Sequence, residues 1–405
     1  MEPELAVALP AAGAIFTTML RPRPRLALVG GVGLGLAGLA AILLSAPGVV
    51  SNQLGLALTL PAATRALLIA AACTLALVIA LAPSRVDRPA LLTRGLAGLA
   101  GLVAIAAAPS LDIVILAVLA LAVLQAASAG RRSLAARLRA PVLAAALLAL
   151  GLAFARMQGP PTLARLAAVA LVAGLAAAVG TLPYLHEFDA EEAAVASPIP
   201  WLAFLGPVLG LALLLRGREL VPTAEAAFGA MLVGLGVLNV VWGTVASWRT
   251  EGAAAAWRYS FIADWGLALC GFGLAVPDGS AAGILVLYGI LLGRLPLYLW
   301  SRPALRERTS NDRPVNLLTA AALAGSAPFA GFPARVLLLS GATQLYWPLA
   351  LVLAVGLLLW LPPSLRLGRS MGAPRGRMLV GVGIALAISA VMGLYPRPFL
   401  ALAGL

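Results

Sequence analysis

The chain has 405 residues, of which 62% are apolar, and only 11% are charged. Soluble globular proteins carry about 25% charged residues, so this chain has too few polar side chains to cover a water-soluble surface. All 28 basic residues are arginines, and the formal net charge is +13. The apolar runs are long and Ala/Leu-rich, unlike the short alternating segments of membrane β-barrels. Composition therefore predicts an all-α polytopic membrane protein and argues against a nucleic-acid binder.

The sequence offers little material for a cofactor or metal site. Cys73 and Cys270 both lie inside apolar runs, where a cysteine behaves as a small hydrophobic residue, and there is a single histidine. We therefore expect no metal, no cofactor and no catalytic site in this chain. The N-terminus is acidic and lacks the basic region of a cleaved signal peptide, so we expect the whole chain to be mature.

The apolar runs predict about fourteen membrane-spanning helices, since a span needs roughly 20 apolar residues. In chain order they are 5–20, 26–46, 60–82, 92–109, 111–129, 138–157, 163–182, 197–216, 223–248, 256–275, 280–300, 315–340, 346–366 and 376–396. If the connections alternate between the two sides, one side carries twenty of the 28 arginines and the other carries five. The positive-inside rule places the Arg-rich side in the cytoplasm, so both termini are predicted on the non-cytoplasmic side.

One connection on the Arg-rich side is acidic instead. Residues 183–197 contain His186 and the acidic run 187–192, and they contain no arginine. Such a loop is either simply solvated or a docking site for a basic partner surface. The remaining positive charge is explained by topology and by contact with anionic lipids of the bilayer.

Two predicted spans contain helix-breaking residues. The segment 327–335 reads APFAGFPAR, with Pro328, Pro333 and the intramembrane Arg335, and the other interruption begins at Pro183. Proline removes a backbone donor and kinks a helix. Broken helices at membrane depth are tolerated only where the backbone is buried or lines a cavity, and they commonly mark ion or substrate sites. Arg335 is a candidate functional residue because a buried charge is costly.

These segments resemble the antiporter-like membrane subunits of respiratory complex I and of Mrp-type cation/proton antiporters. The likeness is greatest to the subunit that follows the two larger antiporter-like ones in complex I. That family has Pro-Phe-His-x-Trp followed by Ala-Pro-x-Pro-Val, and here residues 183–189 read PYLHEFD and 197–201 read SPIPW. Its Ala-Tyr-Ser-Ser-Ile-Ser-x-Met-Gly stretch corresponds to RYSFIADWG at 258–266, and its Leu-Ala-Gly-Ile-Pro-Pro-Leu-x-Gly-Phe-x-x-Lys corresponds to LAGSAPFAGFPAR at 323–335.

The resemblance implies one transmembrane domain over 1–405, built from two inverted repeats with broken helices. The expected divisions are N-terminal helices at about 1–110, a first repeat at 111–250 and a second at 251–396. It also implies a proton path along buried Glu and Lys residues, and this chain departs from that pattern. The expected Glu falls near Leu121, and expected lysines fall near Val179, on Gly210 and at 252–254. Only the distal Lys keeps a cation, as Arg335.

Arginine stays protonated, so Arg335 cannot relay a proton as a buried lysine can. The remaining candidates for a proton or ion pathway are Asp264, Arg294 and His186. Asp264 paired with Arg335 or with Arg294 is either a structural ion pair or part of a modified relay. His186 is either a surface loop histidine or a pathway residue.

The resemblance implies a diverged antiporter-like subunit in the membrane arm of a complex I-like assembly, either NADH-quinone oxidoreductase or hydrogenase-like. Its role is structural or couples electron transport to proton translocation, its partners are other membrane-arm subunits, and its place is the bacterial cytoplasmic membrane. The alternative is an autonomous secondary ion or proton transporter, although the intramembrane polar residues are few for a solute site. A membrane enzyme acting on lipid-linked substrates is a third reading, and it lacks metal-ligand spacing in the 183–192 cluster.

Overall fold

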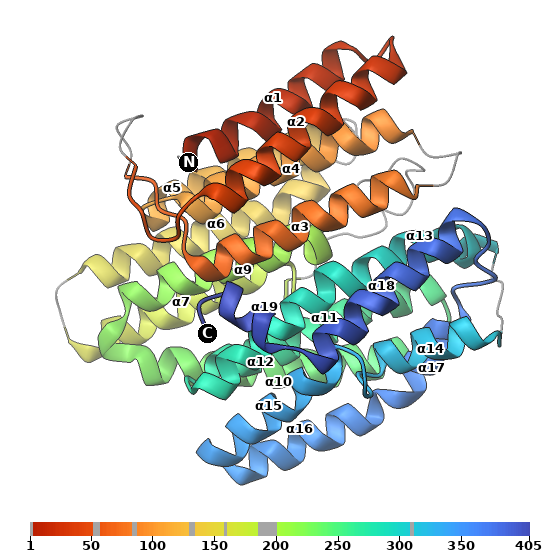
Figure 1. Ribbon diagram of the computed structural model, residues 1–405. Helices are drawn as coiled ribbons and strands as arrows, with labels where there is room; N and C mark the ends of the chain where they lie inside the picture. Colours follow the sequence, from red (N-terminus) through yellow and green to blue (C-terminus); the bar gives the residue numbers. More distant parts are fainter. Residues whose placement is uncertain are drawn as a thin grey trace. The chain divides into compact units, whose positions relative to one another are not determined.

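The computed structural model describes residues 3–51, 57–82, 87–128, 134–157, 160–184, 201–307 and 312–405, and its regular elements in these ranges are helices (Figure 1). The chain divides into two compact units, Met1–Phe228 and Gly229–Leu405. Ten of the described helical segments are long and apolar enough to cross a bilayer, and shorter apolar helices lie at Pro3–Met19, Leu111–Ala126 and Pro314–Leu323. The prediction of an all-α polytopic membrane protein is confirmed.

The first unit begins with a helical hairpin and continues through a series of Ala- and Leu-rich helices. They are α1 (Pro3–Met19), α2 (Pro24–Leu44), α3 (Ala62–Ala80), α4 (Arg88–Ala107), α5 (Leu111–Ser128), α6 (Leu134–Arg156), α7 (Pro161–Val179), the π-helical η2 (Trp201–Leu205), α9 (Gly206–Leu220) and the short 3-10 helix η3 (Pro222–Ala224). Alanine and leucine have high helix propensity. Proline lies in the first turn of several of these helices, where its missing N–H leaves no bond unmade.

Helix α10 (Glu225–Arg249) begins in the first unit and continues into the second. The second unit contains α11 (Ala253–Gly273), α12 (Pro277–Tyr288), the π-helical η4 (Gly289–Arg294), α13 (Leu295–Glu307), α14 (Pro314–Leu323), α15 (Gly331–Leu345), α16 (Trp347–Leu359), α17 (Leu361–Arg369), α18 (Arg377–Leu394) and α19 (Arg397–Leu402).

Each of the fourteen predicted spans overlaps a helix in the described part of the chain. The structure divides several of them further. The spans predicted at 197–216 and 280–300 contain the π-helical segments η2 and η4. The span at 315–340 is broken between α14 and α15, and the span at 346–366 is divided at Trp360 between α16 and α17. The side of the membrane on which each terminus lies stays a prediction, as do the boundaries of the two repeats.

Helices α10 and α11 pack with their backbones unusually close together. A Cβ atom on Gly266 of α11 would lie 2.5 Å from the backbone nitrogen of Val240, and one on Gly236 of α10 would lie 2.7 Å from the carbonyl oxygen of Gly266. Small residues allow this approach, which is how membrane helices gain packing energy without a hydrophobic driving force. Helix α11 is thereby fixed in position, and it carries Asp264.

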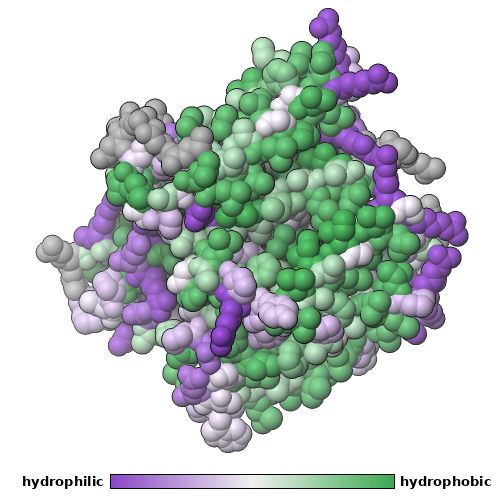
Figure 2. Space-filling model, viewed as in Figure 1, coloured by the Kyte–Doolittle hydropathy of each residue, from purple (hydrophilic) through white to green (hydrophobic). Residues whose placement is uncertain are grey.

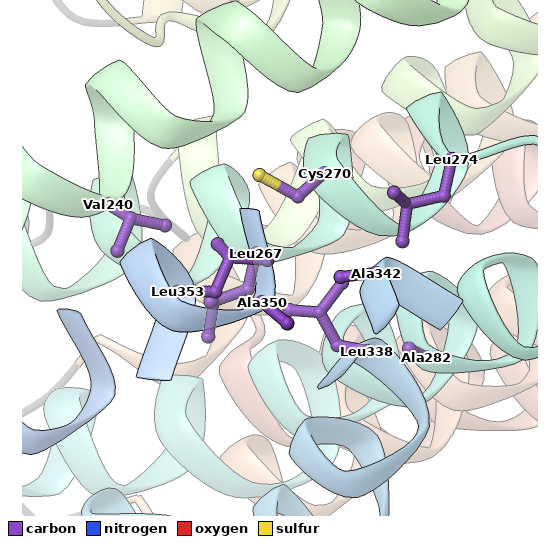
Figure 3. Close-up of a cluster of buried hydrophobic side chains, with 9 residues drawn as sticks. All are labelled: Val240, Leu267, Cys270, Leu274, Ala282, Leu338, Ala342, Ala350 and Leu353. Carbon is purple, nitrogen blue, oxygen red and sulfur yellow. The ribbon is translucent and has the colours of Figure 1, made fainter. Parts of the chain in front are cut away.

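The apolar core of the second unit joins five helices. Figure 3 shows it as a cluster from α10, α11, α12, α15 and α16, made of Val240, Leu267, Cys270, Leu274, Ala282, Leu338, Ala342, Ala350 and Leu353. Cys270 lies in this core, as its sequence context predicted, whereas Cys73 is exposed on α3. A cluster of this kind holds α15 against α11 and α12, next to the helix break that precedes α15.

The outward faces of the helices are apolar over much of their length. In Figure 2 hydrophobic residues cover the helix flanks in this view, and hydrophilic residues gather mainly toward helix ends. Large side chains such as Leu351, Val355 and Leu358 of α16 are exposed. An apolar surface with polar ends is the pattern expected of helices that face lipid.

Candidate functional site: charged residues at a broken helix

The helix that ends at Leu323 resumes at Gly331, and the segment between α14 and α15 is not helical. Gly325 has φ +65°, a conformation that favours glycine because it has no Cβ. The backbone N–H of Ser326 and its hydroxyl both donate to the carbonyl of Ala321, at 3.1 and 2.8 Å. The peptide between Ala327 and Pro328 is cis. The interruption predicted from Pro328 is therefore a compact turn whose own residues satisfy part of the exposed backbone.

The carbonyl of Leu323, freed at the end of α14, accepts two hydrogen bonds from other helices. Arg294 Nη2 donates to it at 3.1 Å, and Trp360 Nε1 donates at 2.8 Å. The Arg294 guanidinium also lies over the Trp360 ring, 5.2 Å from its centroid. A helix C-terminus carries orphan carbonyls and the negative end of the helix dipole, so a cation and an indole N–H are favourable there.

Arg294 also forms a buried ion pair with Asp264. The Nε–Oδ2 distance is 2.6 Å, and the two side chains are only 7% and 13% exposed. Arg294 Nη1 points to the carbonyl of Ser260, one turn before Asp264, at 3.5 Å. Arg294 is the last residue of η4, where the wider π-turn shifts the side-chain positions relative to an α-helix. The pair therefore connects α11, η4 and the end of α14.

Arg335 lies on α15 beside this pair, and within the described residues no hydrogen bond or ion pair reaches it. Its guanidinium lies over the Gly325 backbone, where a Cβ would be 2.5 Å from Cζ. It lines a cavity of about 60 Å³ together with Asp264, Arg294 and Ser389. That volume admits a few water molecules, which need polar partners of this kind.

The three charged side chains interact electrostatically, and together they carry one net positive charge. The sequence left open which arginine pairs with Asp264; the structure places Arg294 in the pair and Arg335 on the cavity wall. Asp264 is the acid among the described residues that line this cavity, and because the other two groups are arginines, it is the member of the three that can gain and lose a proton. A carboxylate held by one guanidinium group, in a cavity that a second one also lines, can act as a counter-charge, bind water or take a proton.

A second break of the same design lies in the first unit, at the end of α7. Gly180 has φ +91°, the N–H of Thr181 donates to the carbonyl of Ala176 at 3.0 Å, and the Leu182–Pro183 peptide is cis. Trp201 Nε1 donates to the carbonyl of Ala178 at 2.8 Å. Each break thus has a left-handed glycine, then a hydroxyl residue, then a cis proline, and an indole donor on the carbonyl two residues before the glycine.

The remaining predicted site residues have different outcomes. Pro183 and Pro328 lie in the two breaks, and Pro333 lies in the first turn of α15. His186 and the acidic run 187–192 lie outside the described residues. Leu121, Val179 and Gly210, where the resemblance placed titratable groups, are buried among apolar residues of the first unit. Among the described residues, no group of three His, Cys, Asp or Glu side chains is arranged to hold a metal ion.

Sequence reasoning missed the two tryptophans and Ser389. Trp360 and Trp201 satisfy the carbonyls at the breaks, and the Ser389 hydroxyl accepts the N–H of Ala330 at 3.3 Å. The one usable signal is that a buried indole N–H needs an acceptor, and a broken helix supplies one.

Solved structures share this fold over almost the whole chain. A chain of the Mrp complex from Dietzia sp. is 17% identical with a TM-score of 0.81, and the match covers all of this chain and 52% of that one. The chain thus spans about half the length of that Mrp protein. A chain of the archaeal membrane-bound sulfane sulfur reductase is 17% identical with a TM-score of 0.78, covering 99% of this chain and 96% of that one.

A chain of respiratory complex I from Thermus thermophilus, in a structure with bound NADH, is 17% identical with a TM-score of 0.76. The match covers 99% of this chain and 98% of the complex I chain. No protein-family model and no curated protein sequence matches this chain. With the broken helices and membrane-spanning composition already described, these likenesses show that the chain shares its fold with membrane chains of Mrp and complex I assemblies.

Proposed function

We propose that the chain is a diverged antiporter-like subunit in the membrane arm of a complex I-like assembly. One observation carries the proposal: a buried Asp264–Arg294 pair at a broken helix, beside Arg335, which lines the same cavity. The proposed role is structural or couples electron transport to proton translocation. The electron-transfer chemistry then belongs to other chains of a bacterial cytoplasmic-membrane complex, either NADH-quinone oxidoreductase or hydrogenase-like.

The nature of the three charged residues limits the mechanism. Arg294 and Arg335 stay protonated, so a proton that passes this point travels through Asp264 or through water in the adjoining cavity. Arg335 then acts as a fixed positive charge that sets the electrostatic potential of the cavity. Without proton passage, the ion pair still fixes α11 against η4 and α14. In both cases, proton passage or structural support, the proposed function of the second unit depends on Asp264, Arg294 and Arg335.

The proposal includes partners at two places. Other membrane-arm subunits pack against the apolar helix flanks, and the acidic run 187–192 binds a basic surface of one of them. The Arg-rich connections lie in the cytoplasm, and both termini lie on the opposite side, as the distribution of arginines favours.

Purification of the tagged, full-length chain from its native membrane tests this proposal. After extraction in a mild detergent, we expect mass spectrometry to identify co-purifying redox subunits in stoichiometric amounts. Recovery of the chain as a lone monomer or homo-oligomer would contradict the membrane-arm role. Ion flux by such a preparation in liposomes would instead identify an autonomous secondary transporter.

A further inference from the structure

An apolar groove of about 240 Å³ lies in the first unit between α2, α3 and α4. Its lining includes Val32 and Leu36 of α2, Ala76 and Ile79 of α3, and Leu92 and Leu96 of α4, and no polar side chain contributes to it. Val32 and Leu36 are 39% and 55% exposed, so the groove is open along α2. Its width and apolar lining suit a hydrocarbon chain.

Arginines extend the lining at one end of the groove. Arg25 precedes Val32 by seven residues on α2, an offset of about 20° around the helix, and Arg88 precedes Leu92 by four residues on α4, an offset of about 40°. Both therefore lie on the stripes that line the groove, at the starts of their helices. Arg25 is exposed, and Arg88 Nη2 donates to the carbonyl of Ala82, just beyond the end of α3, at 2.8 Å.

The N-termini of α2 and α4 lie at this same end. Arg21, in the turn before α2, is 3.8 Å from Asp87, the N-cap residue of α4. The hydroxyl of Thr93 in α4 donates to that of Thr17 near the end of α1 at 2.8 Å. The Asp87 carboxylate accepts the N–H of Ala90 and caps α4, whereas the N-terminus of α2 has no side-chain cap. The positive end of the α2 dipole and the arginines together make this end a favourable setting for an anion.

We propose that this groove binds an anionic phospholipid, with one acyl chain between α2, α3 and α4 and the phosphate beside Arg25 and Arg88. An apolar helix of a partner protein would match the groove but would supply no anion for the excess of arginines at its end. A zwitterionic lipid would fill the groove equally well but would gain less from the arginines. The proposal is independent of the role assigned to the charged cluster of the second unit.

Native mass spectrometry of the full-length chain in a neutral detergent tests the proposal, with phosphatidylglycerol and phosphatidylcholine of identical acyl chains as probes. We expect phosphatidylglycerol to bind more tightly. Arg25→Gln should lower the affinity for phosphatidylglycerol about fivefold and leave the affinity for phosphatidylcholine unchanged, because a surface arginine contributes about one kcal/mol to anionic-lipid binding. Arg23→Gln is the matched control, since Arg23 precedes α2 and lies off the groove stripe.

The groove itself is tested by Ala76→Phe, which fills it from an exposed position on α3. If the new ring displaces two methylene groups of the acyl chain from the groove, the affinity for both lipids should fall about tenfold. Leu116→Phe places the same ring on an exposed part of α5 outside the groove and should have no effect. Equal binding of the two lipids by the unmodified chain would overturn the proposal, as would unchanged binding by Ala76→Phe or a co-purified polypeptide that resists exchange by lipid.

Discussion

The break after α7 and the break between α14 and α15 have the same backbone design and different electrostatics. In both, a left-handed glycine ends the helix and a tryptophan donates to the carbonyl two residues earlier. The second break adds Arg294 on that carbonyl, Asp264 on Arg294, and Arg335 over the glycine. Among the described residues of the first break, no ionic group bonds to the corresponding carbonyl of Ala178. The indole bond is thus common to the two carbonyls, and among the described residues the ionic bond occurs only on Leu323.

The largest expected effect follows from removing Arg294, which the first break lacks. Arg294→Ala strands the Asp264 carboxylate in a buried site and should destabilise the second unit by about 3–5 kcal/mol. Thermal unfolding in detergent, followed by size-exclusion chromatography, measures the change. The double variant Asp264→Leu plus Arg294→Met is the control, because replacing both charges by apolar groups of similar volume is often close to neutral. If Arg294→Ala is as stable as the unmodified chain, the ion pair does not stabilise the second unit.

Exchange of each tryptophan for phenylalanine compares the two breaks directly. Trp201→Phe removes the indole donor from Ala178, which should cost about 1–3 kcal/mol because a buried acceptor is left unmet. Trp360→Phe leaves Leu323 its bond from Arg294, so about 0.5–1.5 kcal/mol is expected. The same unfolding assay ranks the two variants, and a larger loss for Trp360→Phe would reverse our assignment of Arg294 as a second donor.

Replacement of the two glycines should have similar effects on stability. Alanine at Gly180 or at Gly325 is forced into a left-handed conformation, which costs about 1–2 kcal/mol. At Gly325 the new methyl also displaces the end of the flexible Arg335 side chain. If Gly325→Ala alters proton translocation by the assembled complex while the equally destabilised Gly180→Ala does not, the position of Arg335 matters to function. Equal proton translocation by the two variants would show that the position of Arg335 does not matter.

The smallest effect on stability is expected at Arg335 itself. Its guanidinium has no hydrogen bond or ion pair among the described residues, so Arg335→Met should change unfolding by less than about 1 kcal/mol. A loss of 3 kcal/mol or more would mean that Arg335, and not only Arg294, is paired with Asp264. Arg335→Lys keeps a cation at this position but makes it one that can lose its proton. Comparison with Arg335→Met separates the effect of the charge from that of the side-chain volume.

The sequence predicted the helices and both breaks because apolar runs and prolines are local signals. Pro183 and Pro328 marked the two interruptions, and Asp264, Arg294 and Arg335 stood out as charges inside apolar spans. The spacing of Asp264 and the two arginines along the chain could not decide which of them meet. That depends on the approach of α11, fixed by Gly236 and Gly266, and on the π-turn before Arg294, which has no known sequence signal.

The match between the two breaks was also invisible at the level of sequence alone. The motifs GTLP at 180–183 and GSAP at 325–328 share only glycine, a hydroxyl residue and proline. Their tryptophans lie at different separations, 21 residues after Gly180 and 35 after Gly325; Trp201 begins η2, whereas Trp360 lies between α16 and α17. Tertiary packing brings each indole to the same carbonyl, and no local pattern encodes that.

The most direct test of the account is proton translocation by the assembled complex that carries Asp264→Leu plus Arg294→Met. Replacing both charges of a buried ion pair by apolar groups of similar volume is often close to neutral, so the double variant should assemble at normal levels. We predict that it retains electron transfer and loses part or all of the protons translocated per electron. An assembled complex with unchanged proton stoichiometry would contradict a coupling role for the charged cluster and reduce the ion pair to a structural contact.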